Sequence, residues 1–419
     1  MNVACAVIRL SASATYRQQT REFSWFLIGQ ASWFSAFGVQ AVLFPYLIVN
    51  VLLQGPEQIG LAQMAMMGPS LLLMLVGGVV ADASDLRKLL ASLQCVAALP
   101  PLALGCALLV YGPTFPALIA YALCYGACQA FVLPARDALL SRVAGSDVQR
   151  AVTSATALQF ASQIVGFVIG GSARFLGAPV LLFSQAVLLI VGALAALRLS
   201  PAPSIPSSED DRSKGRPRLG DIGSAITEVL QSRKLLPVVI LMVGVGLFFI
   251  PVFMVVIPVM VRDFYAGSSV ELAMVNGAFV LGTITSTVVL MRRAAVQRQG
   301  RAILVALIAG ATLIGLFSLQ PPQVLFYVMI YCFGSGAGVV MSIGRTIAQE
   351  SARPSHRARV LAVYNLGFMG AAPIGAFALG QLGEVVGILA AARYACGGMF
   401  TLLALTAWRT GFWKLRRDG

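Results

Sequence analysis

The sequence has very few charged residues for its length. Only 11% of its 419 residues are Asp, Glu, Lys or Arg, against roughly 25% in an ordinary soluble domain. So few charges cannot cover the surface of a globular protein of this size in water. The shortage therefore excludes a soluble fold and directs attention to the 58% of residues that are hydrophobic.

Residues that bind metals or carry acid–base chemistry are also scarce. There is one histidine, His356. Cys124 and Cys128 lie one helical turn apart but lack the further Cys or His that a zinc site requires. No glycine-rich phosphate loop occurs in the sequence, which argues against direct use of ATP. We expect no metal and no cofactor, and we predict that the protein is not an enzyme.

What the sequence does have is twelve long apolar runs. A helix crosses the roughly 30 Å hydrocarbon layer with about 20 residues. Runs of suitable length lie near 23–51, 59–81, 89–111, 115–133, 151–173 and 179–197, and again near 235–261, 272–291, 302–319, 323–344, 360–382 and 387–408. The predicted fold is therefore all-α, a polytopic membrane protein with twelve transmembrane helices in two six-helix bundles.

Basic residues lie overwhelmingly on one side of this arrangement. With the N-terminus inside, 27 of the 30 Lys and Arg residues fall in inner segments, and only Arg174, Arg262 and Arg393 fall outside. Short cytoplasmic loops retain basic residues, so both termini are predicted to be cytoplasmic, in the inner membrane of a bacterium. The net charge of +14 is spread over these loops and suits anionic lipid headgroups rather than nucleic acid.

A polar stretch at 200–218 divides the chain into two halves. Apolar residues at helical spacing follow it, at 222, 225, 226, 229 and 230, and predict a short helix on the membrane surface. We expect a cytoplasmic N-terminal segment at 1–21, a six-helix bundle at 22–198, a linker with the surface helix at 199–234, a second bundle at 235–409 and a cytoplasmic tail at 410–419. Two bundles of matching topology suit alternating access, in which one rocks against the other.

The loop after the second span carries a recognisable motif. Residues 77–88 read GGVVADASDLRK, with Gly78 and Asp82 followed by Arg87 and Lys88. This loop resembles the signature loop of the major facilitator superfamily, although positions 83, 85 and 86 depart from the usual residues. The resemblance implies a two-bundle transporter fold in which Asp82 pairs with a basic group and latches the inner gate. The competing interpretation is an ordinary basic cytoplasmic turn.

The fifth span contains a second motif. Ser162, Gly166, Gly170 and Gly171 follow the spacing of a glycine-rich motif found in antiporters of that superfamily, with Phe167 where proline is expected. Small residues at this spacing predict close helix packing. Gln159 and Gln163 share the face of these glycines, and either contact a polar cargo or bond a neighbouring helix.

Residues 131–140 and 354–366 resemble the enterobactin-exporter and macrolide-efflux branch of the superfamily. This resemblance implies outward transport of a siderophore or a hydrophobic drug, with the proton gradient as the energy source. It also assigns Arg136, Arg357 and Arg359 to the inner gate, where they would bond helix ends and acidic residues. The alternative is that such arginines only set the topology.

The predicted central cavity is polar but uncharged. Every acidic residue lies in a loop or at a helix end, so the proton-coupling acid is not evident, and Asp82 and Glu271 are the candidates. The cavity would be lined mainly by the first, fourth, seventh and tenth helices. Its predicted cargo-contacting residues are neutral amides and aromatics: Gln30, Trp33, Phe34, Gln129, Gln159, Gln163, Asn276, Tyr327, Tyr331 and Asn365.

This lining suits an amphiphilic or aromatic cargo better than a sugar. The expected partners are a small-molecule cargo, protons and membrane lipid, and we expect a monomer. Three alternatives stay open: uptake of a nutrient or a metal chelate by the same fold, a membrane enzyme such as an acyltransferase, and a sensor that transports nothing.

The topology makes a direct prediction. In a chain without its own cysteines, a single cysteine within 200–218 should react with a membrane-impermeant thiol reagent only after the inner face is made accessible. A cysteine at Thr114, in a predicted outer turn, should react in intact spheroplasts. Reaction of the 200–218 cysteine from outside would contradict the predicted orientation.

Overall fold

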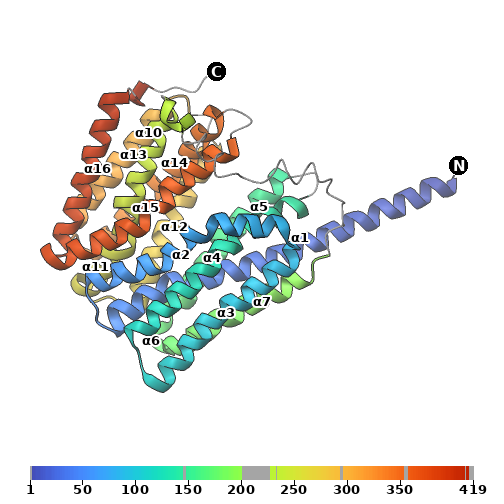
Figure 1. Cartoon of the computed structure of the whole chain (residues 1–419), viewed down its shortest axis with the longest axis horizontal. Helices are drawn as coiled ribbons and strands as arrows, with labels where there is room; N and C mark the ends of the chain where they lie inside the picture. The colour runs from blue at the N-terminus through green and yellow to red at the C-terminus, as the bar shows by residue number, and fades with distance from the viewer. Residues whose placement is uncertain are drawn as a thin grey trace.

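The protein consists of two helical bundles. The computed structural model describes residues 2–144, 148–200, 227–232, 234–292, 296–352, 357–410 and 412–414, and within these ranges every regular element is a helix. Figure 1 shows the two bundles meeting near α6 and α11 and diverging toward the end of the molecule that carries the C-terminus. This arrangement confirms the predicted all-α membrane fold.

The N half forms the first bundle. Its first helix, α1, begins at Asn2 and thus includes the segment 1–21 that we expected to precede the bundle. The next element is a π-helical turn, η1, that extends α1 by one turn. The elements of this half are α1 (Asn2–Tyr46), η1 (Leu47–Val51), α2 (Pro56–Ala83), α3 (Leu86–Tyr111), α4 (Phe115–Val143), α5 (Val148–Gly171), α6 (Ala173–Leu176) and α7 (Ala178–Leu197).

The C half begins with a span made of four consecutive pieces. Pro251 lies between its two π-helical turns, where a residue without an N–H cannot continue the regular ladder. These pieces are α10 (Leu235–Gly244), η2 (Val245–Phe249), η3 (Val252–Val256) and α11 (Ile257–Tyr265). The remaining elements are α12 (Ser269–Arg292), α13 (Gln299–Phe317), α14 (Gln323–Ser351), α15 (Arg357–Val386), α16 (Ile388–Thr410) and η4 (Phe412–Lys414).

Eleven stretches of described residues are long and apolar enough to cross a membrane. The 28-residue helix α2, which packs between α4 and α15, brings the number to twelve. The chain is therefore a multi-pass membrane protein.

The two ends of the bundles differ in how the chain reverses. Six short turns join the helices in pairs at one end, which we call the turn end, and each has one residue of positive φ that lets the chain reverse tightly: Leu53, Gly112, Gly177, Ala266, Gln320 and Gly387. The opposite end, the linker end, carries the basic segments and the connection between the halves. Residues 227–231 of that connection are helical, and Val229 is buried against the C half beside Leu235 and Val360. The first part of the predicted surface helix, 222–226, lies outside the described residues.

Small residues bring helices of the N half into close contact. A Cβ placed at Gly166 would lie 2.7 Å from the Cα of Gly38, so α5 and α1 touch through their main chains. Gly170 faces Val39 and Val42 of α1 at comparable range. Without a hydrophobic force between helices in lipid, such close approach is a main source of cohesion.

The other predicted packing residues of α5 face two directions. The main-chain oxygen of Ser162 accepts a hydrogen bond from Ser35 Oγ at 3.2 Å, again toward α1. Gly171 faces α12 of the other half, because a Cβ there would lie 2.8 Å from the Cβ of Ala273. The glycine-rich face of α5 therefore packs against α1 at Ser162, Gly166 and Gly170, and against α12 of the C half at Gly171.

The packing of α2 against α4 gives a testable prediction. A Cβ at Gly126 of α4 would lie 2.9 Å from the carbonyl carbon of Met66, whereas a Cβ at Gly68 of α2 would meet nothing within 4 Å. Gly126→Ala should therefore destabilise the protein by about 2 kcal/mol through overpacking, seen as a lower Tm in detergent. Gly68→Ala is the matched control and should not lower the Tm. Equal Tm values for the two variants would contradict the close packing of α2 and α4.

Candidate functional site

The two halves are held together at the turn end. Among the described residues, seven hydrogen bonds that involve a side chain cross between the halves, and six of them lie in or next to the turns of that end. The seventh, from Gln63 Nε2 to the oxygen of Met254 at 3.5 Å, lies about two helical turns further in. We call this set of contacts the joint.

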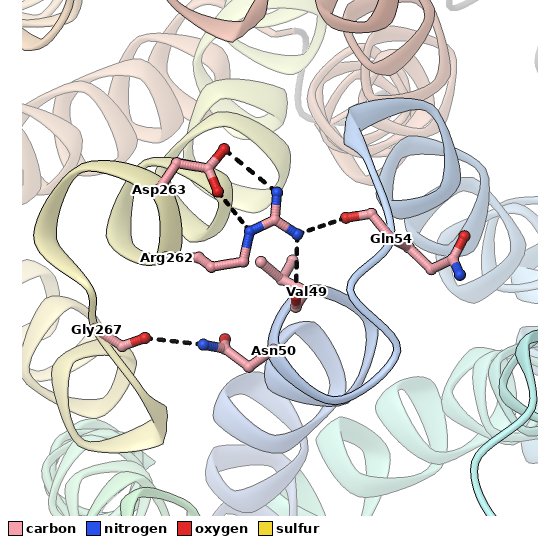
Figure 2. A network of polar contacts seen from close by, with 6 residues as sticks. All are labelled: Val49, Asn50, Gln54, Arg262, Asp263 and Gly267. Carbon is pink, nitrogen blue, oxygen red and sulfur yellow. Dashed lines mark hydrogen bonds and ion pairs between the residues drawn. The ribbon is translucent and has the colours of Figure 1, made fainter.

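Arg262, at the end of α11, makes the most extensive contact of the joint (Figure 2). Its Nη1 donates to the main-chain oxygens of Val49, at 3.0 Å, and Gln54, at 2.8 Å, which belong to the turn after α1. Asp263 accepts from Nε at 2.5 Å and from Nη2 at 3.3 Å. This two-point pairing fixes the guanidinium plane, so that Nη1 is directed across the boundary between the halves.

Beside it, Asn50 Nδ2 donates to the oxygen of Gly267 at 2.8 Å. The Oδ1 atom of Asn50 is buried without a hydrogen-bond partner. The turn after α1 and the turn after α11 are therefore joined in both directions, with Arg262 donating from the C half and Asn50 donating from the N half.

Ser269 forms a second part of the joint. Its side chain is fully buried. Its Oγ donates to the oxygen of Gly171 at 2.7 Å and accepts from the main-chain nitrogen of Arg174 at 3.0 Å. One hydroxyl of α12 thus satisfies the end of α5 and the beginning of α6, groups that helix ends leave unpaired.

The helices α2 and α15 form the third part. Gln381 Nε2 donates to Glu57 Oε1 at 3.0 Å near the turn end. Further in, a Cβ at Gly60 would lie 2.9 Å from the Cα of Gly380. The contact continues to Gly370, where an added Cβ would lie 3.2 Å from Leu71 Cδ1.

Toward the linker end from Leu71 and Gly370, the bundles that contain α2 and α15 diverge (Figure 1). Toward the linker end, Leu366 and Met369 of α15 have 51% and 44% of their surface exposed. No hydrogen bond between described residues connects the halves in this region, and Figure 1 shows the bundles diverging there. The side-chain hydrogen bonds between the described parts of the two halves are therefore concentrated at the turn end, and the bundles diverge toward the linker end (Figure 1).

The predicted cargo-contacting residues fall into two groups. Gln30, Trp33, Phe34 and Gln163 are almost completely buried. Gln30 Nε2 donates to the oxygen of Ala155 at 2.6 Å, and Trp33 stacks on Tyr125 with ring centres 6.3 Å apart. These residues lie inside the N half.

The second group is accessible. Asn365 is exposed, and the others are half-buried: Gln129, Gln159, Asn276, Tyr327 and Tyr331. Two of these are engaged locally, since Asn276 Nδ2 donates to Leu272 O of its own helix at 2.8 Å and the Tyr327 hydroxyl accepts from Gln323 at 3.1 Å. No hydrogen bond joins any two of the ten predicted residues.

Comparisons with known proteins decide the family. The sequence profile of the Major Facilitator Superfamily matches residues 26–376, which is most of the chain and includes both halves. The chain belongs to the Major Facilitator Superfamily. No curated protein matches the sequence.

Solved transporters share the fold of this major facilitator. A point variant of the nucleoside transporter NupG is similar with a TM-score of 0.74 at 14% identity, over 92% of this chain and 99% of that one. NupG itself gives 0.71 at 14% identity, over 92% and 98%. A structure described as giving insight into substrate recognition in proton-dependent oligopeptide transporters gives 0.67 at 13% identity, over 94% and 97%. At these identities the likeness shows the fold alone.

The predicted gate residues of this major facilitator lie apart from the joint. Arg136 pairs with the adjacent Asp137 at 3.0 Å and lies over the ring of Phe34. Arg87 Nη1 donates to Leu199 O at 3.2 Å, within the N half. Lys88 is exposed, and Gly78 has open space around it. The side chains of Asp82, Arg357 and Arg359 lie outside the described residues, so the latch stays a prediction.

Glu271, one of the two predicted coupling acids, caps a helix. Its Oε2 accepts from the nitrogen and the hydroxyl of Ser268, at 2.6 and 2.7 Å. This is a capping arrangement at the start of α12, and the spacing from Ser268 to Glu271 is its usual sequence signature. The carboxylate is thereby occupied at the turn end of the C half.

Sequence reasoning missed the residues of the joint, although a signal was present. Only three basic residues were assigned to the outer side, and two of them lie in the joint: Arg262 through its guanidinium, and Arg174 through its main-chain nitrogen. The third, Arg393, is exposed and donates to Leu389 O of its own helix at 3.4 Å. Because the predicted outer side has so few basic residues, each one there was a candidate for a contact between the halves.

The geometry of Arg262 predicts its effect on the joint. Arg262→Gln removes two charge-assisted hydrogen bonds across the boundary and should shift the balance toward opening at the turn end by about 2 kcal/mol, roughly thirty-fold in population. Spin labels on Leu53 and Leu319, exposed turn residues of the two halves, should report a longer distance.

Arg393→Gln is the matched control and should leave the label distance unchanged. If Arg262→Gln also leaves it unchanged, Arg262 does not hold the joint closed.

Proposed function

We propose that this protein exports an amphiphilic or hydrophobic organic molecule, of the siderophore or drug class, across the inner membrane of a bacterium by alternating access. The proton gradient would supply the energy. The proposal extends the shared fold of the superfamily to a direction, a cargo class and an energy source for this chain.

One observation carries the alternating-access mechanism, namely that the hydrogen bonds between the described parts of the halves gather at the turn end. The joint closes that end, while the bundles diverge toward the linker end (Figure 1). The one-sided distribution of basic residues favours a cytoplasmic linker end, and in that orientation this conformation would receive cargo from the cytoplasm. Export then requires the joint to open and the linker end to close.

The chemistry of the partly exposed residues in the predicted cargo set supports the cargo class. The accessible members of the predicted cargo set are amides and phenols, with no carboxylate or cation among them: Gln129, Gln159, Asn276, Tyr327, Tyr331 and Asn365. Aromatic faces and neutral hydrogen-bonding groups bind ligands that have both apolar and polar surface. A strongly charged cargo would find no opposite charge within this set.

A second candidate function is uptake, and a specific observation favours it. The similar structures include the nucleoside transporter NupG. A nucleoside is also aromatic and neutral, so the same side chains would suit it. The direction of transport therefore separates the two candidates more clearly than the cargo chemistry does.

The direction can be measured in everted membrane vesicles. Energised vesicles that contain the protein should accumulate a siderophore or a macrolide, and a protonophore should abolish the accumulation. Accumulation of a nucleoside in right-side-out vesicles, with no accumulation of any siderophore or macrolide in everted ones, would replace export by uptake.

A matched pair of variants tests whether the accessible residues bind the cargo. Tyr331→Leu removes a half-buried phenol of the predicted set, and the half-saturating cargo concentration should rise about five-fold, the value of one aromatic contact. Tyr394→Leu, which removes an exposed phenol of α16, should leave it unchanged. Equal effects of the two substitutions would remove Tyr331 from the binding site.

A further inference from the structure

The N half contains a small internal cavity, separate from the joint. It lies between α1, α3, α4 and α7, near the linker end, and has a volume of about 20 Å³. Most of its wall is apolar and includes Trp33, Leu90 and Val132. Three polar side chains also line it, Gln30 from α1, Gln94 from α3 and Arg136 from α4.

Each of these three side chains has a buried polar atom without a hydrogen-bond partner. The atoms are Gln30 Oε1, Gln94 Oε1 and Arg136 Nη1. Gln30 and Gln94 are more than nine-tenths buried as whole residues. A buried polar atom left unpaired costs about 1–3 kcal/mol, and more when the group is charged. Three such atoms around one cavity therefore point to a small polar ligand that bonds them.

The orientation of two of the groups is fixed by other contacts. Gln30 Nε2 donates to Ala155 O at 2.6 Å, so the atom of Gln30 that is left for the cavity is its oxygen. Arg136 is held by Asp137 at 3.0 Å and by the ring of Phe34, 4.7 Å from the guanidinium carbon. The cavity thus receives one N–H donor and at least one carbonyl acceptor.

We propose that one water molecule occupies this cavity, accepting a hydrogen bond from Arg136 Nη1 and donating to Gln30 Oε1 and Gln94 Oε1. A water needs about 10–15 Å³ of such space and two to four polar partners, and the cavity supplies about 20 Å³ and three. With one donor and two acceptors as partners, every polar atom is satisfied once.

Ions fit the same atoms less well. A cation would be repelled by the Arg136 guanidinium, and an anion would face the carbonyl oxygen of Gln30, which cannot turn away without losing its bond to Ala155. Gly192 of α7 helps to form the site, because a Cβ there would lie 2.9 Å from Gln94 Cδ. The small residue on α7 leaves room for the Gln94 amide.

The water connects three helices through Arg136. It ties the guanidinium to α1 and α3 of its own half, in addition to Asp137 and Phe34. Arg136 is therefore a positioning residue that makes the linker end of the N half rigid, and its side chain stays with that half when the halves move relative to each other.

The first test is a structure of the full-length protein at a resolution that shows ordered water. It should contain a single density peak within hydrogen-bonding distance of Gln30 Oε1, Gln94 Oε1 and Arg136 Nη1. An empty cavity, or a direct bond between Gln94 and Arg136, would overturn the proposal. So would an anomalous signal at this position after bromide replaces chloride, since the occupant would then be an anion.

A double-mutant cycle gives a second, independent test. Gln94→Leu and Arg136→Leu should each lower the Tm by a few degrees, and the double variant should fall by less than the sum, because the first substitution already removes the bridge. The control pairs Gln94→Leu with Gln185→Leu, a buried glutamine that bonds Tyr121 and does not line the cavity, and its effects should add. Additive effects for Gln94 and Arg136 would show that no water couples them.

Discussion

The conformation of this protein depends on the two hydrogen bonds that Arg262 donates across the boundary between the halves, to the main-chain oxygens of Val49 and Gln54. A charged group can make such a contact only where water or headgroups surround it, because the hydrocarbon layer does not tolerate an unpaired charge. The polar contacts between the halves are therefore gathered at the turn end. Deeper in the membrane, α2 and α15 meet through small residues such as Gly60 and Gly380. Contacts of this kind are tight but not directional, so the halves can separate there without leaving polar groups unpaired.

Within each half, by contrast, polar groups hold helices together along their length. In the N half, Ser32 Oγ bonds the oxygen of Leu188, and Ser35 Oγ bonds that of Ser162. At the linker end, Arg87 and Arg142 donate to the oxygens of Leu199 and Ser200, just after α7. The proposed water beside Arg136 adds a further link in the same region. A rigid half concentrates movement at the joint, as rocking of one bundle against the other requires.

The fold was predictable because lipid imposes it on the sequence. Twelve apolar runs and a one-sided distribution of arginines gave the helices and their pairing, and departures were local, such as α1 beginning at Asn2. The partners of Arg262 in the joint were not predictable, because they are the main-chain oxygens of Val49 and Gln54, and every residue carries such an acceptor whatever its side chain. Polarity marked Gln30 as a possible cargo contact but could not show that its amide is directed at Ala155. Glu271 followed a capping signature that was readable in the sequence.

Alternating access requires the joint to open during transport. Glu57 and Gln381 face each other across it, 3.0 Å apart. In a chain whose seven native cysteines are replaced, cysteines at these two positions can be connected by a short bifunctional thiol reagent with one cleavable bond. The cross-linked protein should still bind cargo from the linker end but should not transport it, and cleavage should restore transport. Undiminished transport by the cross-linked protein would show that the joint stays closed throughout the transport cycle.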